Sequence, residues 1–237
     1  MHICFIIAME AEAASLIEKF SLDEVTHFAS GLPMWAWSGL QGADQISVVV
    51  NGKDADYNLD LIGTQAATLS THLAINHFKP DMIISAGTAG AFQSKGANIG
   101  DVYLSYPHVV FHDRRVDIPG WDKMGVGRFP VYDVREMALT LKLKTGVVTT
   151  GNSLDMPETD EATIRAIGGE IKEMEAAAVA WVASLHKVPM FCVKSVTDLV
   201  DSAHPTHEQF LSNLRLAVES LTEVCLKVVG YILVHKP

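Results

Sequence analysis

The sequence is poor in cysteine and in basic residues, and it has no long apolar run. None of its apolar stretches approaches the roughly 18 residues of a membrane-spanning helix, so we expect no membrane association. It has 18 Lys and Arg residues and 28 Asp and Glu residues. The basic residues form no dense block, which argues against nucleic-acid binding. The three cysteines, Cys4, Cys192 and Cys225, are odd in number and sit among apolar neighbours, as is typical of free thiols in a reducing compartment. With no signal-peptide pattern at the N-terminus, these features predict a cytoplasmic protein.

Several motifs of nucleotide and hydrolase chemistry are also missing. The segment Gly87-Thr88-Ala89-Gly90 fits neither the dinucleotide fingerprint nor the P-loop, and Gly151-Asn152-Ser153-Leu154 is not a serine nucleophile elbow. His204 and His207 are three residues apart but have no further ligand nearby in the sequence. We therefore expect no metal and no cofactor.

What the sequence does contain is typical of one α/β domain covering residues 1–237. Of its residues 49% are hydrophobic and 19% charged, which suits a large buried core. Strand-like and helix-like segments alternate, which predicts a mixed central sheet flanked by helices in three layers. The predicted strands are His2–Ala8, 35–37, 46–51, 82–85, 102–104, 108–111, 146–150 and 190–196. The predicted helices are 10–20, 59–78, 161–167, 174–186 and a last one from a capping box at Thr206-His207-Glu208-Gln209 to about Val234, and 117–129 is predicted as a loop.

Polar residues follow four of the predicted strands, where open α/β sheets bind ligands. They are Glu10 with Glu12, 87–90, 151–155, and Asp198 after Thr197. Each has an ordinary structural explanation as well. Carboxylates in a first helical turn interact favourably with the helix N-terminus, and an aspartate after a strand often caps a turn. The tripeptide Glu173-Met174-Glu175 is harder to explain in this way, because it lies among apolar and alanine-rich positions.

Together these segments resemble the 5′-methylthioadenosine/S-adenosylhomocysteine nucleosidase family of the purine and uridine phosphorylase superfamily. The resemblance runs nearly end to end and in the same order. The matching segments are Ile7-Ala8-Met9-Glu10-Ala11-Glu12, Ser85-Ala86-Gly87-Thr88-Ala89-Gly90, Lys172-Glu173-Met174-Glu175-Ala176 and Ser195-Val196-Thr197-Asp198. Residues 96–102, 111–115 and 198–201 resemble the plant-type branch in particular.

The resemblance implies hydrolysis of the N-glycosidic bond of 5′-methylthioadenosine in methionine salvage, and it leaves open whether S-adenosylhomocysteine is accepted. Such a reaction passes through an oxocarbenium-like state in which the purine leaves as an anion. Asp198 matches the family's proton donor to purine N7, which requires a carboxyl group with a raised pKa. Glu12 matches the carboxylate that deprotonates the attacking water. Glu175 matches the residue that binds the ribose hydroxyls and stabilises the developing cation.

The resemblance also implies the remaining substrate contacts and a partner. Met174 is expected to pack on the sugar, with Lys172 and Glu173 beside it in the same strand. Further expected contacts are Thr88 and Gly90 at the ribose and base, the backbone near Leu154 and Asp155 at the adenine edge, and Phe210 over the 5′-alkylthio group. The loop around Ile118 of a second subunit is expected to complete the pocket, which implies a homodimer.

Two departures from the family pattern and three alternative functions remain. Asn152 stands where the family often has an aspartate, and Ala91 where it often has a glycine. A nucleoside phosphorylase usually binds phosphate through arginines near the first helix and before the glycine-rich loop, and no arginine lies near Glu10, Glu12 or Ser85. A non-catalytic nucleoside-binding or storage protein, or a nucleosidase for another adenosine derivative such as aminodeoxyfutalosine, would retain the same pocket.

Overall fold

The computed structural model describes residues 1–236 and has one mixed, ten-stranded sheet between two groups of helices. The sheet runs in the order β10-β6-β8-β9-β5-β1-β4-β3-β2, with β7 paired to β6. The strands are β1 (His2–Ile7), β2 (Asp23–Glu24), β3 (Trp35–Gln41), β4 (Asp44–Val50), β5 (Met82–Ala91), β6 (Val102–Phe111), β7 (Phe129–Pro130), β8 (Lys144–Thr150), β9 (Ile171–Glu173) and β10 (Met190–Leu199).

Part of this sheet closes on itself. Strand β10 pairs in parallel with β5 as well as antiparallel with β6, so β5, β10, β6, β8 and β9 form a closed ring. Strand β1 continues the sheet outward, parallel to both β5 and β4. The parallel strands β1, β5 and β10 therefore end at the same edge of the sheet, where the polar segments found in the sequence come together.

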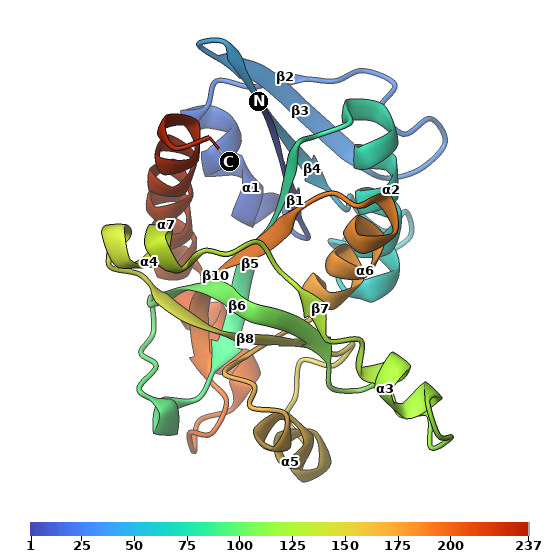
Figure 1. Ribbon diagram of the computed structural model, residues 1–237, viewed down its shortest axis with the longest axis vertical. Coiled ribbons are helices and arrows are strands. Elements are labelled where there is room, and N and C mark those ends of the chain that lie inside the picture. The colour runs from blue at the N-terminus through green and yellow to red at the C-terminus, as the bar shows by residue number, and fades with distance from the viewer. Residues whose placement is uncertain (237) are drawn as a thin grey trace.

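The helices cover both faces of the sheet, as Figure 1 shows. On one side the long α7 lies beside α1 and α4, and on the other α2 packs against α6. The α-helices are α1 (Glu10–Lys19), α2 (Thr64–Phe78), α3 (Trp121–Val126), α4 (Arg135–Leu141), α5 (Glu158–Ala166), α6 (Ala176–His186) and α7 (Thr206–Val234). Within residues 1–236, no helix is both long and apolar enough to cross a bilayer.

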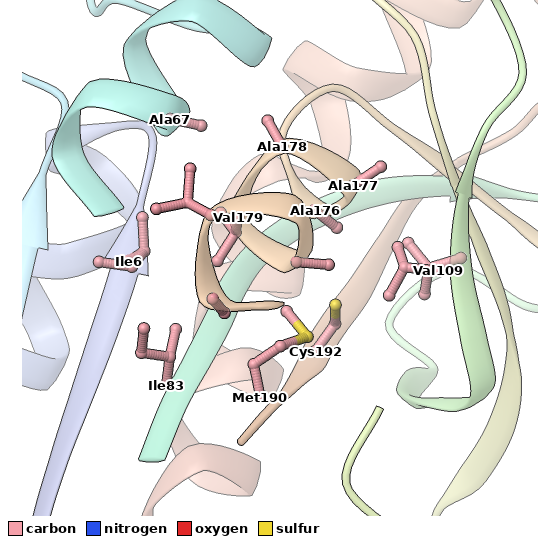
Figure 2. Packing of buried hydrophobic residues seen from close by; sticks show 14 of the residues in the cluster. Ile6, Ala67, Ile83, Val109, Ala176, Ala177, Ala178, Val179, Met190 and Cys192 are labelled. Carbon is pink, nitrogen blue, oxygen red and sulfur yellow. The ribbon is translucent and has the colours of Figure 1, made fainter. Parts of the chain in front are cut away.

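The core between α2, α6 and the sheet depends on small side chains. Figure 2 shows Ala176, Ala177 and Ala178 of α6 packed between the strands and α2, where Ala67 approaches from the facing helix. Alanine on a buried helix lets neighbouring elements come close without loss of helix propensity. The close packing fixes the first turn of α6, and with it the residues just before that turn.

The structure confirms the predicted architecture of a mixed sheet in a three-layer α/β arrangement, and it corrects several element boundaries. Helix α2 begins at Thr64 and not at Leu59, and α6 begins at Ala176 and not at Met174. Residues 102–104 and 108–111 belong to one strand, β6. The predicted loop 117–129 contains the short helix α3 and the start of β7, and α4 was not predicted.

The predicted capping box at the start of α7 is wrong. Pro205 is the N-cap residue and no side chain caps the helix. The Gln209 amide instead donates to the carbonyl of His204, and its oxygen accepts from the Leu199 N–H at 3.0 Å. A side chain that crosses to the end of β10 satisfies more backbone groups than a local cap would. Gln209 therefore fixes α7 against the strand that carries Asp198.

Candidate active site

A pocket lies where β1, β5 and β10 end, and the empty space in it, counting its open mouth, is about 720 Å³. Most of its lining is apolar, with carboxylates from three separate segments. The lining residues are Ala8, Met9, Glu12, Ile62, Thr88, Ala89, Gly90, Leu154, Lys172, Glu173, Met174, Glu175, Thr197, Asp198, Val200 and Phe210. The fold thus brings together ten of the eleven residues predicted for the site.

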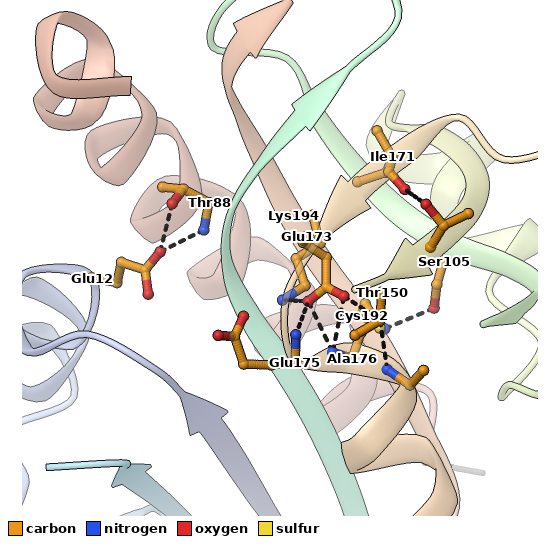
Figure 3. Close-up of polar contacts among 12 residues, drawn as sticks. Glu12, Thr88, Ser105, Thr150, Ile171, Glu173, Glu175, Ala176, Cys192 and Lys194 are labelled. Carbon is orange, nitrogen blue, oxygen red and sulfur yellow. Dashed lines mark hydrogen bonds and ion pairs between the residues drawn. The ribbon is translucent and has the colours of Figure 1, made fainter. Parts of the chain in front are cut away.

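Glu12 is a buried carboxylate held by several donors. It lies in the first turn of α1 and is 3% exposed. Its Oε1 accepts from both the N–H and the hydroxyl of Thr88, at 2.6 and 2.7 Å (Figure 3), and its Oε2 accepts from the Met9 N–H at 3.3 Å. Burial raises the pKa of Glu12, while these hydrogen bonds act in the opposite direction by stabilising the anion.

Asp198 has a different environment at the same pocket. It is 2% exposed, and the Thr197 hydroxyl is its hydrogen-bond donor, at 2.8 Å from Oδ1. Burial raises the pKa of Asp198, opposed by that hydroxyl and by the charge of Lys172. Thr197 is the extra residue of a β-bulge between Val196 and Asp198, a device that redirects side chains beside functional sites.

Gly90 is required by the close approach of Asp198. A Cβ atom at this position would lie 2.5 Å from Asp198 Oδ2, which is closer than van der Waals contact permits. The residue faces Asp198 of β10 on one side and Lys172 of β9 on the other. The missing side chain therefore leaves the space that the proposed proton donor occupies.

Glu175 lies between two helix N-termini. It is the N-cap residue of α6, and its Oε1 accepts from the N–H of Gly63, the N-cap residue of α2, at 2.7 Å. Burial and the nearby carboxylate of Glu173 raise the pKa of Glu175 to about 7, while the Gly63 N–H and the charge of Lys194 act against that rise. The N-terminus of a helix carries partial positive charge, which favours the ionised carboxylate.

Glu173 was predicted to lie beside the substrate, but in the structure its carboxylate binds protein groups. Its carboxylate forms a buried ion pair with Lys194 at 2.9 Å, accepts from the N–H groups of Glu175 and Ala176, and accepts from the Thr150 hydroxyl (Figure 3). All of these partners are protein groups. Glu173 thus fixes the start of α6 and the neighbouring Glu175 backbone, although the residue itself borders the pocket.

Lys194 is the important residue that sequence reasoning missed. It lies in the middle of β10 and is 2% exposed, and the charge of Glu173 raises its pKa against the effect of burial. The sequence feature that could have identified it is a single lysine directly after the apolar run Phe191-Cys192-Val193. A lysine is almost never fully buried unless it is paired, so its presence there implied a buried acidic partner.

Lys172 and the segment after β8 form the other side of the pocket. The Lys172 ammonium donates to the carbonyls of Ser153 and Leu154, the latter at 3.1 Å. Burial lowers the pKa of Lys172, with neighbouring carboxylates, Asp198 first, opposing the shift. Leu154 borders the pocket, whereas Asp155 does not and instead lines an adjoining groove with His204 and His207. Leu154 lines that groove as well, so the two residues share the groove and only Leu154 also borders the pocket.

The remaining sequence candidates fall into two groups. Thr88, Met174 and Phe210 border the pocket. Glu10 lies outside it and forms an ion pair with Lys53 at 2.6 Å. Asp201, in the segment 198–201 that resembles the plant-type branch, accepts from the N–H groups of Gln93 and Ser94 and so has a structural role. Within residues 1–236, no group of three or more His, Cys, Asp or Glu side chains is placed to hold a metal ion.

Comparison with known families and sequences gives a consistent result. The family model of the phosphorylase superfamily matches residues 2–230. The 5′-methylthioadenosine nucleosidase of Arabidopsis thaliana is 46% identical over 97% of this chain and 86% of its own length. The 5′-methylthioadenosine/S-adenosylhomocysteine nucleosidase of the same plant is 42% identical over 97% of this chain and 91% of its own length.

Solved structures agree with these matches. The apo structure of Arabidopsis thaliana 5′-methylthioadenosine nucleosidase superposes with a TM-score of 0.95 at 45% identity, covering 98% of this chain and 95% of that one. The futalosine hydrolase of Helicobacter pylori has a TM-score of 0.82 at 22% identity, covering 98% of each chain. At that identity the likeness concerns the fold alone.

Proposed function

Because the chain belongs to the 5′-methylthioadenosine/S-adenosylhomocysteine nucleosidase family of the phosphorylase superfamily, we propose that it hydrolyses 5′-methylthioadenosine to adenine and 5-methylthioribose. The observation that carries the proposal is the asymmetry between two buried carboxylates. Glu12 accepts three hydrogen bonds that favour its anion, whereas Asp198 accepts one. Two carboxyl groups in different environments at one pocket are suited to opposite roles as base and acid.

The reaction follows from these roles. Asp198 donates its proton to N7 of the purine as the bond between C1′ and N9 breaks, and the bonding electrons move into the base. Ionised Glu175 stabilises the positive charge that develops on the sugar. Glu12 takes a proton from water while the water oxygen forms the new bond to C1′. The products are neutral adenine and methylthioribose, and Asp198 and Glu12 return to their starting states through exchange with solvent.

The same pocket favours water over phosphate as the nucleophile. A phosphorylase binds a phosphate dianion with cationic side chains. Among the described residues bordering this pocket, Lys172 is the cationic one, and its ammonium already donates to two carbonyls. The carboxylate of Glu12 would repel a phosphate placed beside Thr88. The presence of both Glu12 and Asp198 likewise argues against a non-catalytic binding or storage protein.

We also propose a homodimer in which the loop around Ile118 of one subunit completes the pocket of the other. Ile118, Trp121 and Met124 are each more than half exposed, an unusual density of large apolar side chains on one short segment. Burial of these side chains against a second copy would remove them from water. The proposed setting is methionine salvage in the cytoplasm, with which the three free, buried cysteines are compatible.

The test is to incubate the protein with 5′-methylthioadenosine, with and without phosphate, and to identify the sugar product. Free methylthioribose, released at a rate independent of phosphate, is the expected result. Formation of the sugar 1-phosphate would instead assign the protein as a phosphorylase. Tight binding of the nucleoside without release of adenine would identify a binding protein.

A further inference from the structure

Asn152 connects three segments of the chain beside the pocket. Its side-chain oxygen accepts from both the N–H and the hydroxyl of Thr64, each at 2.9 Å. Its backbone N–H and its side-chain amide both point to Oδ2 of Asp113, at 2.9 and 3.3 Å. The residue thus joins the segment after β8 to the end of β6 and to the first turn of α2.

The hydrogen bonds from Thr64 to Asn152 help to cap α2, because the preceding residue, Gly63, cannot do so. Gly63 has no side chain with which to cap α2, so the N–H groups at the start of the helix need acceptors from elsewhere. Asn152 supplies the acceptor for Thr64, and Glu175 supplies the acceptor for Gly63. A Cβ on Gly63 would lie 3.0 Å from the Asn152 oxygen, which shows how tightly the two residues pack.

We propose that Asn152 is a positioning residue that holds the start of α2 in place and thereby keeps the Gly63 N–H on the Glu175 carboxylate. Asparagine suits this position because it accepts on one side and donates on the other. An aspartate would keep the acceptor for Thr64 but would set a second negative charge against Asp113. The inference rests on the proposed function, in which Glu175 acts in its ionised form.

The charged groups around Glu175 explain why the single Gly63 N–H affects the pKa of this residue. Glu173 on β9 and Glu12 on α1 disfavour its ionisation, as does burial. Lys194 on β10 and the Gly63 N–H at α2 favour it. Loss of the ordered Gly63 N–H removes one of the two favourable groups, so the pKa of Glu175 should rise above about 7.

The experiment compares the wild-type chain with Asn152→Ala, which removes the side-chain bonds to Thr64 and Asp113, keeps the backbone bond to Asp113 and adds no charge. The pKa of Glu175 is read by NMR titration of 13C-labelled glutamate side chains, and the acid limb of kcat/KM for 5′-methylthioadenosine is measured in parallel. We expect both to move upward by about half a pH unit to one unit, with kcat/KM near pH 6.5 falling about tenfold at most. Thr64→Val, which removes one of the two donors, should give a smaller shift in the same direction.

The matched control is Asn98→Ala. The backbone N–H and side-chain amide of Asn98 point to one oxygen of Asp101, at 2.7 and 3.4 Å, in the same arrangement but away from the pocket. This variant should keep the wild-type titration and activity. An unchanged Glu175 titration in Asn152→Ala, or an equal loss of activity at every pH, would overturn the positioning role. A shifted titration in a protein that releases no adenine would leave the positioning role standing and reject the proposed function.

Discussion

At the scale of single residues, the site depends on which carboxyl groups carry a proton. Asp198 and Glu12 are almost equally buried, so burial alone does not distinguish them. The difference lies in their donors: the Thr197 hydroxyl for Asp198, against two groups of Thr88 and the Met9 N–H for Glu12. Hydrogen bonds to an anion stabilise it, so Glu12 is the carboxyl group better suited to be ionised and to accept a proton, and Asp198 the one better suited to hold a proton until the purine takes it.

Asp198→Asn tests the proton donor. The amide retains the shape of the side chain but cannot protonate the purine, so we expect kcat to fall by about 10²–10⁴-fold. Binding of an adenine nucleoside, measured by calorimetry, should remain within a few-fold of wild type because the pocket is otherwise intact. A variant that turns over at nearly the wild-type rate would contradict the assignment of Asp198.

Glu175→Gln tests how much the ionised Glu175 carboxylate lowers the free energy of unfolding. The native pKa of about 7 lies above the ordinary value of 4.5, so the folded protein holds this proton more tightly than the unfolded chain does. The free energy of unfolding therefore falls as the pH rises from 4.5 to 7, and the loss persists above 7. Glutamine removes the titration and can still accept from Gly63.

We therefore expect Glu175→Gln to be inactive but more stable than wild type at pH 8, by about 1–3 kcal/mol. Near pH 4, where the wild-type carboxyl group is neutral, the difference should almost vanish. Urea unfolding at both pH values and at one fixed protein concentration measures this. Equal stability of the two proteins at pH 8 would show that ionised Glu175 does not destabilise the folded protein.

At the scale of elements, the position of α6 depends on a buried ion pair that the sequence only hinted at. Lys194 of β10 and Glu173 of β9 pair at 2.9 Å, and Glu173 also accepts from the first N–H groups of α6. The pair thus connects two strands and a helix at the place where Glu175 begins the helix.

Lys194→Met should lower the free energy of unfolding by about 3–5 kcal/mol, because it leaves the Glu173 carboxylate buried without its partner. Adding Glu173→Gln in the same chain should recover part of that loss, since the uncompensated charge is then gone. Chemical denaturation of the single and double variants provides the measurement. A loss below about 1 kcal/mol for Lys194→Met would contradict the role of the pair.

Sequence reasoning predicted the elements that have strong periodicity and the residues that follow strands. Glu12, Thr88 and Asp198 could be placed because each follows the apolar run of β1, β5 or β10, and the parallel arrangement of these strands brings the three segments together. Helix α3 escaped prediction because its six residues contain glycine and too few apolar positions to show a helical period. The closure of β10 on β5 could not be predicted either, because strand pairing depends on contacts distant in the sequence.

At the scale of the whole molecule, the fold places an acid and a base from different parts of the chain on one pocket. Glu12 comes from the first helix after β1, and Asp198 from the end of β10, so neither is positioned until the sheet has formed. The exposed apolar side chains around Ile118 add a second requirement, since we propose that a partner subunit covers them. Activity should therefore depend on assembly as well as on the fold of one chain.

The most direct test of the central claim is turnover of 5′-methylthioadenosine in water enriched in 18O, with products analysed promptly by mass spectrometry. If Glu12 activates water for attack on C1′, the methylthioribose formed should carry one 18O atom, and the adenine none. The same outcome should hold when unlabelled phosphate is present in excess. A sugar product that carries phosphate, or no cleavage of the nucleoside at all, would contradict the account.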